Sequence, residues 1–215
     1  MTQSDLNARQ NLLVLGTIVE GGLVILALGL AWLGLWDQTQ PLETLFKCWE
    51  AWKAPALLGC VATIPMLAYL VVFHFWTPKF LSPMQRFVDL KLKPLFQGSS
   101  LVEMLVLSLM AGFGEELFFR WCLQGGITHL LIPSMGTGGS IAIGVIVASL
   151  LFGACHWVNS AYGATTFLVG IYLGMLMVWS GSWLVPAIAH ALFDFVAMIY
   201  IARWPARDIS KQIRS

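Results

Sequence analysis

Six long apolar stretches constrain the fold of this chain more than any other feature of its sequence. They lie near residues 12–36, 54–76, 101–124, 139–158, 163–180 and 183–202. A helix needs about 20 mostly apolar residues to cross the hydrocarbon core of a bilayer. Charged residues make up only 11% of the chain, far below the share in soluble domains. The sequence therefore predicts an all-α, polytopic transmembrane bundle of about six spans, with residues 1–215 forming a single integral membrane domain.

The basic residues predict how this bundle is oriented. With six spans, one side of the membrane holds only Lys47 and Lys53, while Arg120 falls inside the membrane. The opposite side holds Arg9, Lys79, Arg86, Lys91, Lys93, Arg203, Arg207, Lys211 and Arg214. Because cytoplasmic loops carry an excess of Lys and Arg, we expect both termini to be cytosolic in a multi-pass protein of the cell membrane. The net charge of +1 gives no reason to expect nucleic acid as a partner, so the lipid bilayer is the expected surrounding.

Three charged residues interrupt the third apolar stretch, in the sequence G-F-G-E-E-L-F-F-R. They are Glu115, Glu116 and Arg120. A charge at the bilayer centre costs about 2.5–3.5 kcal/mol on insertion scales, so such residues usually face a partner or a wet cavity. Residues four apart share a helix face, which predicts an ion pair between Glu116 and Arg120. Glu115 then points about 100° away and remains as a candidate general base.

A histidine ends the fourth apolar stretch, in L-L-F-G-A-C-H, with Phe152 one turn before His156. The Pro- and Gly-rich break between the third and fourth stretches is centred between Met135 and Gly136. If the two helices pack antiparallel about that break, Glu115 and His156 lie at the same level. This arrangement requires the third helix to continue past Gly126 to about residue 132, beyond the end estimated from hydropathy.

The last apolar stretch carries a second histidine and an acid one turn later, His190 and Asp194. A carboxylate beside an imidazole fixes its tautomer and its orientation. Glu20, flanked by two glycines in the first stretch, is interpreted as structural support for the polar cluster. His74 and His129 lie at or near helix ends and are interpreted as interfacial residues.

Two segments between spans are interpreted as membrane-surface elements. Residues 36–53 are expected to form an outer loop whose Trp49 and Trp52 belong to an aromatic belt. Residues 78–97 alternate basic and apolar side chains, and we expect them to lie along the cytosolic surface.

The three polar elements resemble the motifs of the CAAX protease and bacteriocin-processing family, also called the Abi family of intramembrane proteases. The family motifs are E-E-x-x-x-R, F-x-x-x-H and H-x-x-x-N/D. Here they read Glu115-Glu116-x-x-x-Arg120, Phe152-x-x-x-His156 and His190-x-x-x-Asp194, in the family order. The resemblance covers about residues 101–200, the protease-like core of such proteins.

The resemblance implies an endopeptidase that hydrolyses a peptide bond of a membrane-associated protein or peptide. In that reading Glu115 activates the attacking water and His156 helps to hold it. Glu116 and Arg120 orient this pair, and His190 and Asp194 contact the scissile carbonyl.

Asp194 departs from the prenyl-protein proteases of the family, which typically carry Asn at this position. An amide can donate a hydrogen bond to an oxyanion, whereas an ionised carboxylate cannot. Asp194 therefore acts in protonated form, or orients His190, or binds a metal; it also favours a substrate that is not prenylated. No cofactor is required by the sequence, but the family was named as metalloproteases. A divalent metal such as Zn²⁺ on His156, His190, Glu115 and Asp194 thus stays open.

Two other functions compete with an intramembrane peptidase. A non-catalytic immunity or assembly factor could use the same scaffold, with the polar cluster serving partner binding. A small ion-coupled transporter is disfavoured, because the sequence shows no pair of broken helices that indicates an inverted repeat.

Overall fold

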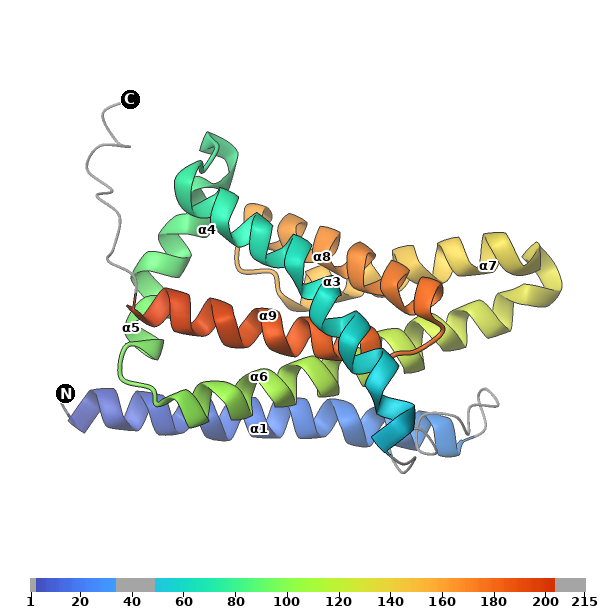
Figure 1. The fold of residues 1–215 in the computed structure, drawn as a ribbon, viewed down its shortest axis with the longest axis horizontal. Helices are drawn as coiled ribbons and strands as arrows, with labels where there is room; N and C mark the ends of the chain where they lie inside the picture. The colour runs from blue at the N-terminus through green and yellow to red at the C-terminus, as the bar shows by residue number, and fades with distance from the viewer. Residues whose placement is uncertain (1–2, 34–48, 204–215) are drawn as a thin grey trace.

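The computed structural model describes residues 3–33 and 49–203, which fold into helices joined by short connections (Figure 1). In chain order the elements are α1 (Gln3–Trp32), α3 (Trp49–Phe75), η1 (Lys79–Leu81), α4 (Ser82–Phe87), η2 (Val88–Leu92), α5 (Lys93–Phe96), α6 (Leu101–Glu116), η3 (Leu117–Gln124), α7 (Gly125–Cys155), α8 (Ser160–Ser180) and α9 (Leu184–Arg203). These residues include no β-strand. The predicted all-α helical bundle is confirmed.

Within residues 3–33 and 49–203, four helical stretches are long and apolar enough to cross a membrane: Trp52–Phe75, Leu101–Cys155, Ser160–Ser180 and Leu184–Arg203. The second of these is 55 residues long and contains two of the predicted spans. Val14–Leu30 is a shorter apolar helix within α1. Large apolar side chains such as Val61 and Leu168 are exposed over the outer surface, as expected for contact with lipid. The chain is therefore a multi-pass integral membrane protein.

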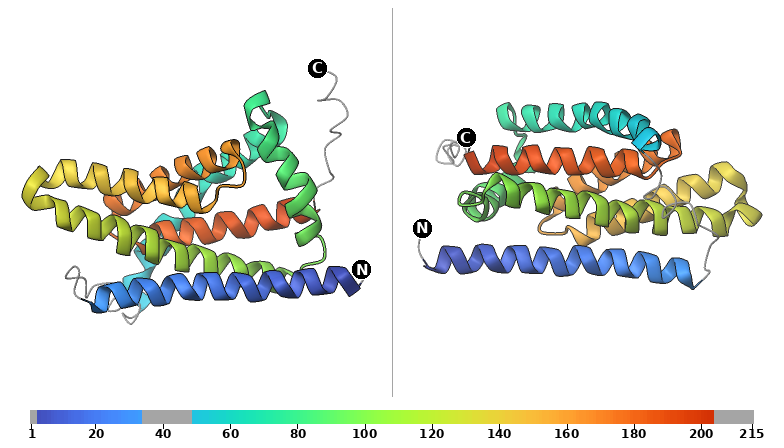
Figure 2. Two further views of the ribbon diagram at one scale, coloured as in Figure 1. Left: turned by 180° about the vertical axis from the view of Figure 1, so that it is seen from behind. Right: turned by 60° about the horizontal axis from the view of Figure 1, so that its bottom comes forward.

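Two helices form the centre of the bundle and position the polar residues. Helix α6 packs against α9, while α1 lies along the outer side of α6 and α3 along the outer side of α9 (Figures 1 and 2). Helix α8 packs on α7. The beginning of α1 and the end of α9 lie at the same end of the bundle, near α5 (Figure 2). The cytosolic location of the termini stays a prediction.

Local sequence explains where two of these helices begin. Ser100 precedes α6 and its hydroxyl accepts a hydrogen bond from the Glu103 backbone N–H, while Glu103 Oε2 accepts from the Ser100 backbone N–H at 2.8 Å. Such a reciprocal capping box satisfies two backbone donors that a helix start would otherwise leave unpaired. Asn159 caps α8 in a similar way, accepting from the Tyr162 backbone N–H at 3.0 Å.

The chain reverses direction inside α7, and the apolar stretch estimated from hydropathy ends before this reversal. Gly136 has a φ of 68° inside this helix, a left-handed conformation that glycine adopts without steric cost. The helical run that begins at Leu101 therefore continues to this glycine, and not to 124 as the apolar stretch suggested. The two arms pack closely, because a Cβ on Gly144 would collide with the Thr128 hydroxyl. The second arm ends at Cys155 rather than at 158.

Other boundaries also differ from the expectation. Helix α1 begins at Gln3, well before the first apolar residue of the stretch. Hydropathy detects only the part of a helix that lies in lipid, and the polar residues before it continue the same helix. Trp49 and Trp52 belong to α3, so the predicted loop ends earlier than 53; residues 34–48 lie outside the described residues.

The segment 78–97 is helical and is partly packed into the bundle. Lys93 and Phe96 are buried, and Phe96 joins Met104 and Leu107 in an apolar cluster with residues of α9. The predicted surface location therefore holds only for part of this segment.

Candidate active site

Glu116 and Arg120 form the ion pair that their spacing predicted. Arg120 Nε lies 2.8 Å from Glu116 Oε2, and both side chains are fully buried. The guanidinium carbon of Arg120 also lies 5.0 Å from the centre of the Phe152 ring, within the range of a cation–π contact. Each charge therefore has an intramolecular partner, which offsets part of the cost of burying it.

Glu115 and His156 lie at the same level of the bundle, as the hairpin argument predicted. His156 Nε2 is 3.5 Å from Glu115 Oε1. The longer third helix and the reversal at Gly136 bring them together, so the hairpin registry was right and the hydropathy boundary was wrong. Glu115 is only 8% exposed, and its carboxylate faces both histidines.

The orientation of His156 follows from its other ring nitrogen. His156 Nδ1 lies 2.8 Å from the backbone carbonyl oxygen of Phe152. A carbonyl oxygen only accepts hydrogen bonds, so Nδ1 carries the hydrogen and Nε2 is directed at Glu115. The ring centres of Phe152 and His156 are 4.5 Å apart, which holds the imidazole against an apolar surface.

His190 connects the two glutamates to Asp194. Its Nδ1 lies 3.1 Å from Glu116 Oε1, and its Nε2 lies 3.5 Å from Asp194 Oδ2 and 4.0 Å from Glu115 Oε2. The contact with Asp194 supports the interpretation that this acid orients His190. The contact with Glu116 was not predicted, since helical spacing shows neighbours within one helix and not across two.

A close approach of α6 and α9 makes the contact between Glu116 and His190 possible. A Cβ on Gly112 would lie 2.6 Å from the Cβ of Ala191, so only glycine fits at this crossing. Gly112 lies one turn before Glu116, and Ala191 directly follows His190. The sequence offered a signal here, the small residues on both helices, which permit close backbone contact in membrane bundles.

Glu20 approaches the same cluster from α1. One of its carboxylate oxygens would lie 3.0 Å from a Cβ on Gly114, and it is close enough to Glu115 to interact electrostatically. Glu20 Oε2 is buried without a hydrogen-bond partner among the described residues. The structure thus adds Glu20 to the surroundings of the site. Whether it serves only as support stays a prediction.

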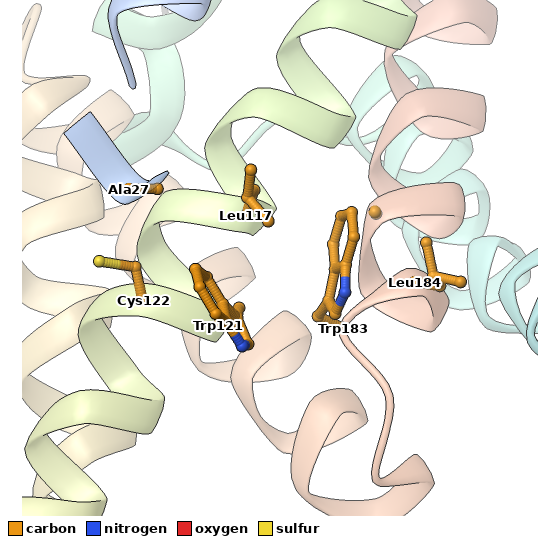
Figure 3. Packing of buried hydrophobic residues seen from close by; sticks show 7 residues of the cluster. Ala27, Leu117, Trp121, Cys122, Trp183 and Leu184 are labelled. Carbon is orange, nitrogen blue, oxygen red and sulfur yellow. The ribbon is translucent and has the colours of Figure 1, made fainter. Parts of the chain in front are cut away.

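The helix that carries the two glutamates widens directly after them. Leu117–Gln124 form a π-helical segment, a rare geometry that often occurs at functional sites. Figure 3 shows the apolar cluster beside it, in which Leu117 and Trp121 of this segment lie near Trp183, the residue directly before α9. This packing fixes the chain immediately beyond Glu116. No periodicity in the sequence indicated the wider turn.

A cavity of about 150 Å³ lies in front of these residues. Its walls include Glu115, His156, His190 and Asp194, together with Tyr69, Met84, Phe152, Tyr162, Thr165, Thr166, Val169 and Phe193. Four of these residues, Tyr69, Thr165, Val169 and Phe193, also line a larger apolar cavity of about 360 Å³ between α3 and α8. The polar site therefore adjoins an apolar space.

A metal at this site was left open by the sequence. Among the described residues, no group of three or more His, Cys, Asp or Glu side chains is arranged to hold a metal ion. The arrangement of the donors thus gives no support to the proposed ligand set of His156, His190, Glu115 and Asp194. His74 is not part of the site and is hydrogen-bonded to the hydroxyl of Tyr200.

Comparison with known proteins agrees with the motifs. Residues 97–196 match the family model described as type II CAAX prenyl endopeptidase Rce1-like. The "Uncharacterized protein YpbD" of Bacillus subtilis (strain 168) is 31% identical over 107 residues, which are 48% of this chain and 48% of that protein. The match thus spans about half the length of this curated relative. No solved structure matches the chain.

The matched segment contains all three motifs and every residue of the cluster except Glu20. The resemblance to the CAAX protease and bacteriocin-processing family is therefore confirmed over residues 97–196, in the form of its Rce1-like members.

Proposed function

We propose that the protein is an intramembrane endopeptidase that hydrolyses a peptide bond in a membrane-associated protein or peptide. The observation that carries this proposal is the convergence of Glu115, His156 and His190 on one small cavity. The match to the Rce1-like family supports the same reaction class. Membrane helices alone would not require so many ionisable groups at one place.

Glu115 is the general base in this proposal. It removes a proton from a water molecule while the water oxygen bonds to the carbonyl carbon of the substrate. His156 assists, because its Nδ1 donates to Phe152 and its Nε2 is left as an acceptor. A water that donates one hydrogen to Glu115 and the other to His156 directs its lone pair away from both, toward the substrate.

His190 and Asp194 serve the carbonyl group of the substrate. His190 Nδ1 is held by Glu116, so Nε2 faces the cavity with Asp194 beside it. A protonated Nε2 donates a hydrogen bond to the oxyanion that forms when water adds. The C–N bond then breaks, and the departing nitrogen takes the proton that Glu115 had accepted.

Glu116 and Arg120 act as positioning residues. Their ion pair is sealed from solvent, and Glu116 also holds His190. The Phe152 ring contacts both the Arg120 guanidinium and the His156 imidazole. Phe152 therefore connects the buried pair to the residues that face the substrate.

The shape of the site suits a substrate that carries an apolar segment. The polar cavity shares Tyr69, Thr165, Val169 and Phe193 with the larger apolar cavity. A peptide anchored by a lipid chain or an apolar helix can keep that anchor in apolar surroundings while its polar bond reaches Glu115. Burying an apolar chain favours binding by roughly 0.8 kcal/mol for each CH₂ group.

Two fluorogenic peptides in phosphatidylethanolamine and phosphatidylglycerol vesicles test this function. One ends in an S-farnesyl cysteine followed by three residues, and the other carries an N-terminal palmitoyl chain without a prenyl group. We expect the reconstituted protein to cleave at least one of them, and the preferred peptide identifies the anchor. In parallel, quantitative proteomics of membrane peptides from cells with the wild type or Glu115→Ala identifies the natural substrate.

The alternative, a non-catalytic immunity or assembly factor, makes the opposite prediction. If the folded wild-type protein cleaves neither peptide and leaves the membrane proteome unchanged, the proposed peptidase is wrong. A phenotype that Glu115→Gln preserves would then indicate partner binding by the same scaffold.

A further inference from the structure

Stabilisation of the oxyanion is the step for which the cluster offers the fewest donors. An ionised Asp194 cannot donate a hydrogen bond, and Glu115 serves as the base. His156 Nδ1 is engaged by a backbone carbonyl, and His190 Nδ1 by Glu116. His190 Nε2 is the one ring donor of the cluster that faces the cavity, and two carboxylates compete for it. A second donor on the cavity wall would therefore complete the site.

Four hydroxyl groups line this cavity, and those of Thr166 and Tyr69 are poorly suited to the task. The Thr166 hydroxyl donates to the backbone carbonyls of its own helix, at 3.0 Å from that of Tyr162 and 3.1 Å from that of Gly163. The Tyr69 hydroxyl is sealed from solvent, with the Thr165 side chain close by. The Thr166 hydroxyl is therefore engaged and the Tyr69 hydroxyl is shielded, while the Thr165 side chain interacts with Tyr69.

Tyr162 differs from Thr166 and Tyr69. Its hydroxyl makes no hydrogen bond among the residues that the structure describes, and it is not among the sealed polar atoms. The side chain lies on the cavity wall close enough to Asp194 and Glu115 to interact electrostatically with both. Tyr162 thus presents an available donor beside the acid that cannot donate.

The backbone of Tyr162 is fixed before any substrate arrives. Asn159 caps the start of α8 and binds the Tyr162 N–H, and the Asn159 amide also donates to the Pro83 carbonyl oxygen at 3.4 Å. The Tyr162 ring packs edge-to-face on Phe87 of α4, with ring centres 5.6 Å apart. A donor held this way needs little reorganisation when charge develops, which is the condition for strong oxyanion stabilisation.

We propose that Tyr162 is a further catalytic residue, whose hydroxyl donates a hydrogen bond to the carbonyl oxygen of the substrate as the tetrahedral oxyanion forms. The proton stays on Tyr162 throughout. The transferred proton is the one that passes from water through Glu115 to the departing nitrogen. This inference rests on the proposed peptidase function. It concerns a residue outside the three motifs.

Replacement of the hydroxyl tests the inference. Tyr162→Phe keeps the ring and its contact with Phe87 and removes only the donor. We expect kcat on the preferred fluorogenic peptide to fall by about 10²-fold, the usual effect of losing one oxyanion donor, with KM within about twofold. The thermal unfolding midpoint in detergent should not change, because the hydroxyl makes no hydrogen bond in the free protein.

Tyr200→Phe is the matched control. Tyr200 lies on α9, outside both of these cavities, and its hydroxyl is hydrogen-bonded to His74, so its loss lowers the midpoint and leaves kcat unchanged. Tyr69→Phe and Thr165→Val test the competing hydroxyl groups of the cavity. Unchanged kcat in Tyr162→Phe, or an equal loss of kcat in Tyr200→Phe, overturns the inference while the peptidase function stands. Absence of cleavage by the wild type on both peptides overturns the two together.

Discussion

Glu116 Oε1 lies 3.1 Å from His190 Nδ1, so the buried ion pair of α6 directly holds the imidazole of α9. The same carboxylate binds Arg120 through its other oxygen. One glutamate thus neutralises a buried cation and orients a residue of the cavity. This relationship separates the roles of the neighbouring glutamates, because Glu115 alone faces the cavity.

We expect Glu115→Gln to abolish most of the peptidase activity. The amide keeps the shape of the side chain but cannot accept a proton, and general bases contribute about 10²–10⁴-fold to rate. Cleavage of the fluorogenic peptides measures the loss. Glu103→Gln on the same helix is the control, since Gln also serves in a capping box and the residue lies at the start of α6, outside the cavity. Comparable activity in both variants would contradict the role of Glu115.

Arg120→Met should destabilise the protein strongly. It leaves Glu116 buried without its cation, and breaking a buried pair from one side costs about 3–5 kcal/mol. The decrease should appear in the thermal unfolding midpoint measured in detergent. Arg86→Met replaces an exposed arginine and should change the free energy of unfolding by no more than about 0.5 kcal/mol. Equal midpoints for these two variants would show that the Arg120 pair is dispensable.

Gly112→Ala should lower both stability and activity. The added methyl group would lie 2.6 Å from Ala191, which forces α6 and α9 apart and lengthens the contact between Glu116 and His190. Overpacking of this kind costs about 1–3 kcal/mol. Gly138→Ala adds the same methyl group where no atom lies within 4 Å, and it should be neutral. The unfolding midpoint and kcat are measured for both variants. Equal values in the two variants would contradict the close packing of α6 and α9.

Replacement of Asp194 distinguishes its possible roles. If Asp194 only orients His190, Asp194→Asn retains activity, because an amide oxygen still accepts from Nε2–H. We expect kcat of Asp194→Asn to exceed that of Asp194→Ala by roughly tenfold or more, consistent with loss of a hydrogen-bonding partner. Two equally inactive variants would instead show that the negative charge of Asp194 is needed.

Metal dependence can be measured directly. Since no three His, Cys, Asp or Glu side chains of the described residues are arranged as ligands, we expect activity to survive treatment with EDTA and 1,10-phenanthroline. Elemental analysis of the purified protein before and after treatment reports how much metal was removed. Loss of activity that added Zn²⁺ restores would reinstate the metal ligands left open by the motifs.

Much of the site follows from helical spacing and from one turn. The contact of Glu116 with Arg120 depends on a four-residue separation within one helix, which any α-helix brings together. Glu115 and His156 lie at the same level of the bundle because they are about equally far along the chain from the break near Gly136. Pro and Gly composition located that break better than hydropathy did, since residues 125–135 continue the helix beyond the length that one bilayer crossing needs.

The sequence by itself determined the all-α membrane fold, the acidic and basic residues of the cluster, and the pairing of neighbours along each helix. These follow from the cost of exposing backbone and charge to lipid, which local sequence controls. Only the tertiary structure decided that Glu116 holds His190, that Phe152 contacts Arg120, and that Tyr162 lies beside Asp194. Such contacts join helices far apart in the chain, and their geometry depends on how closely small residues such as Gly112 allow the helices to pack.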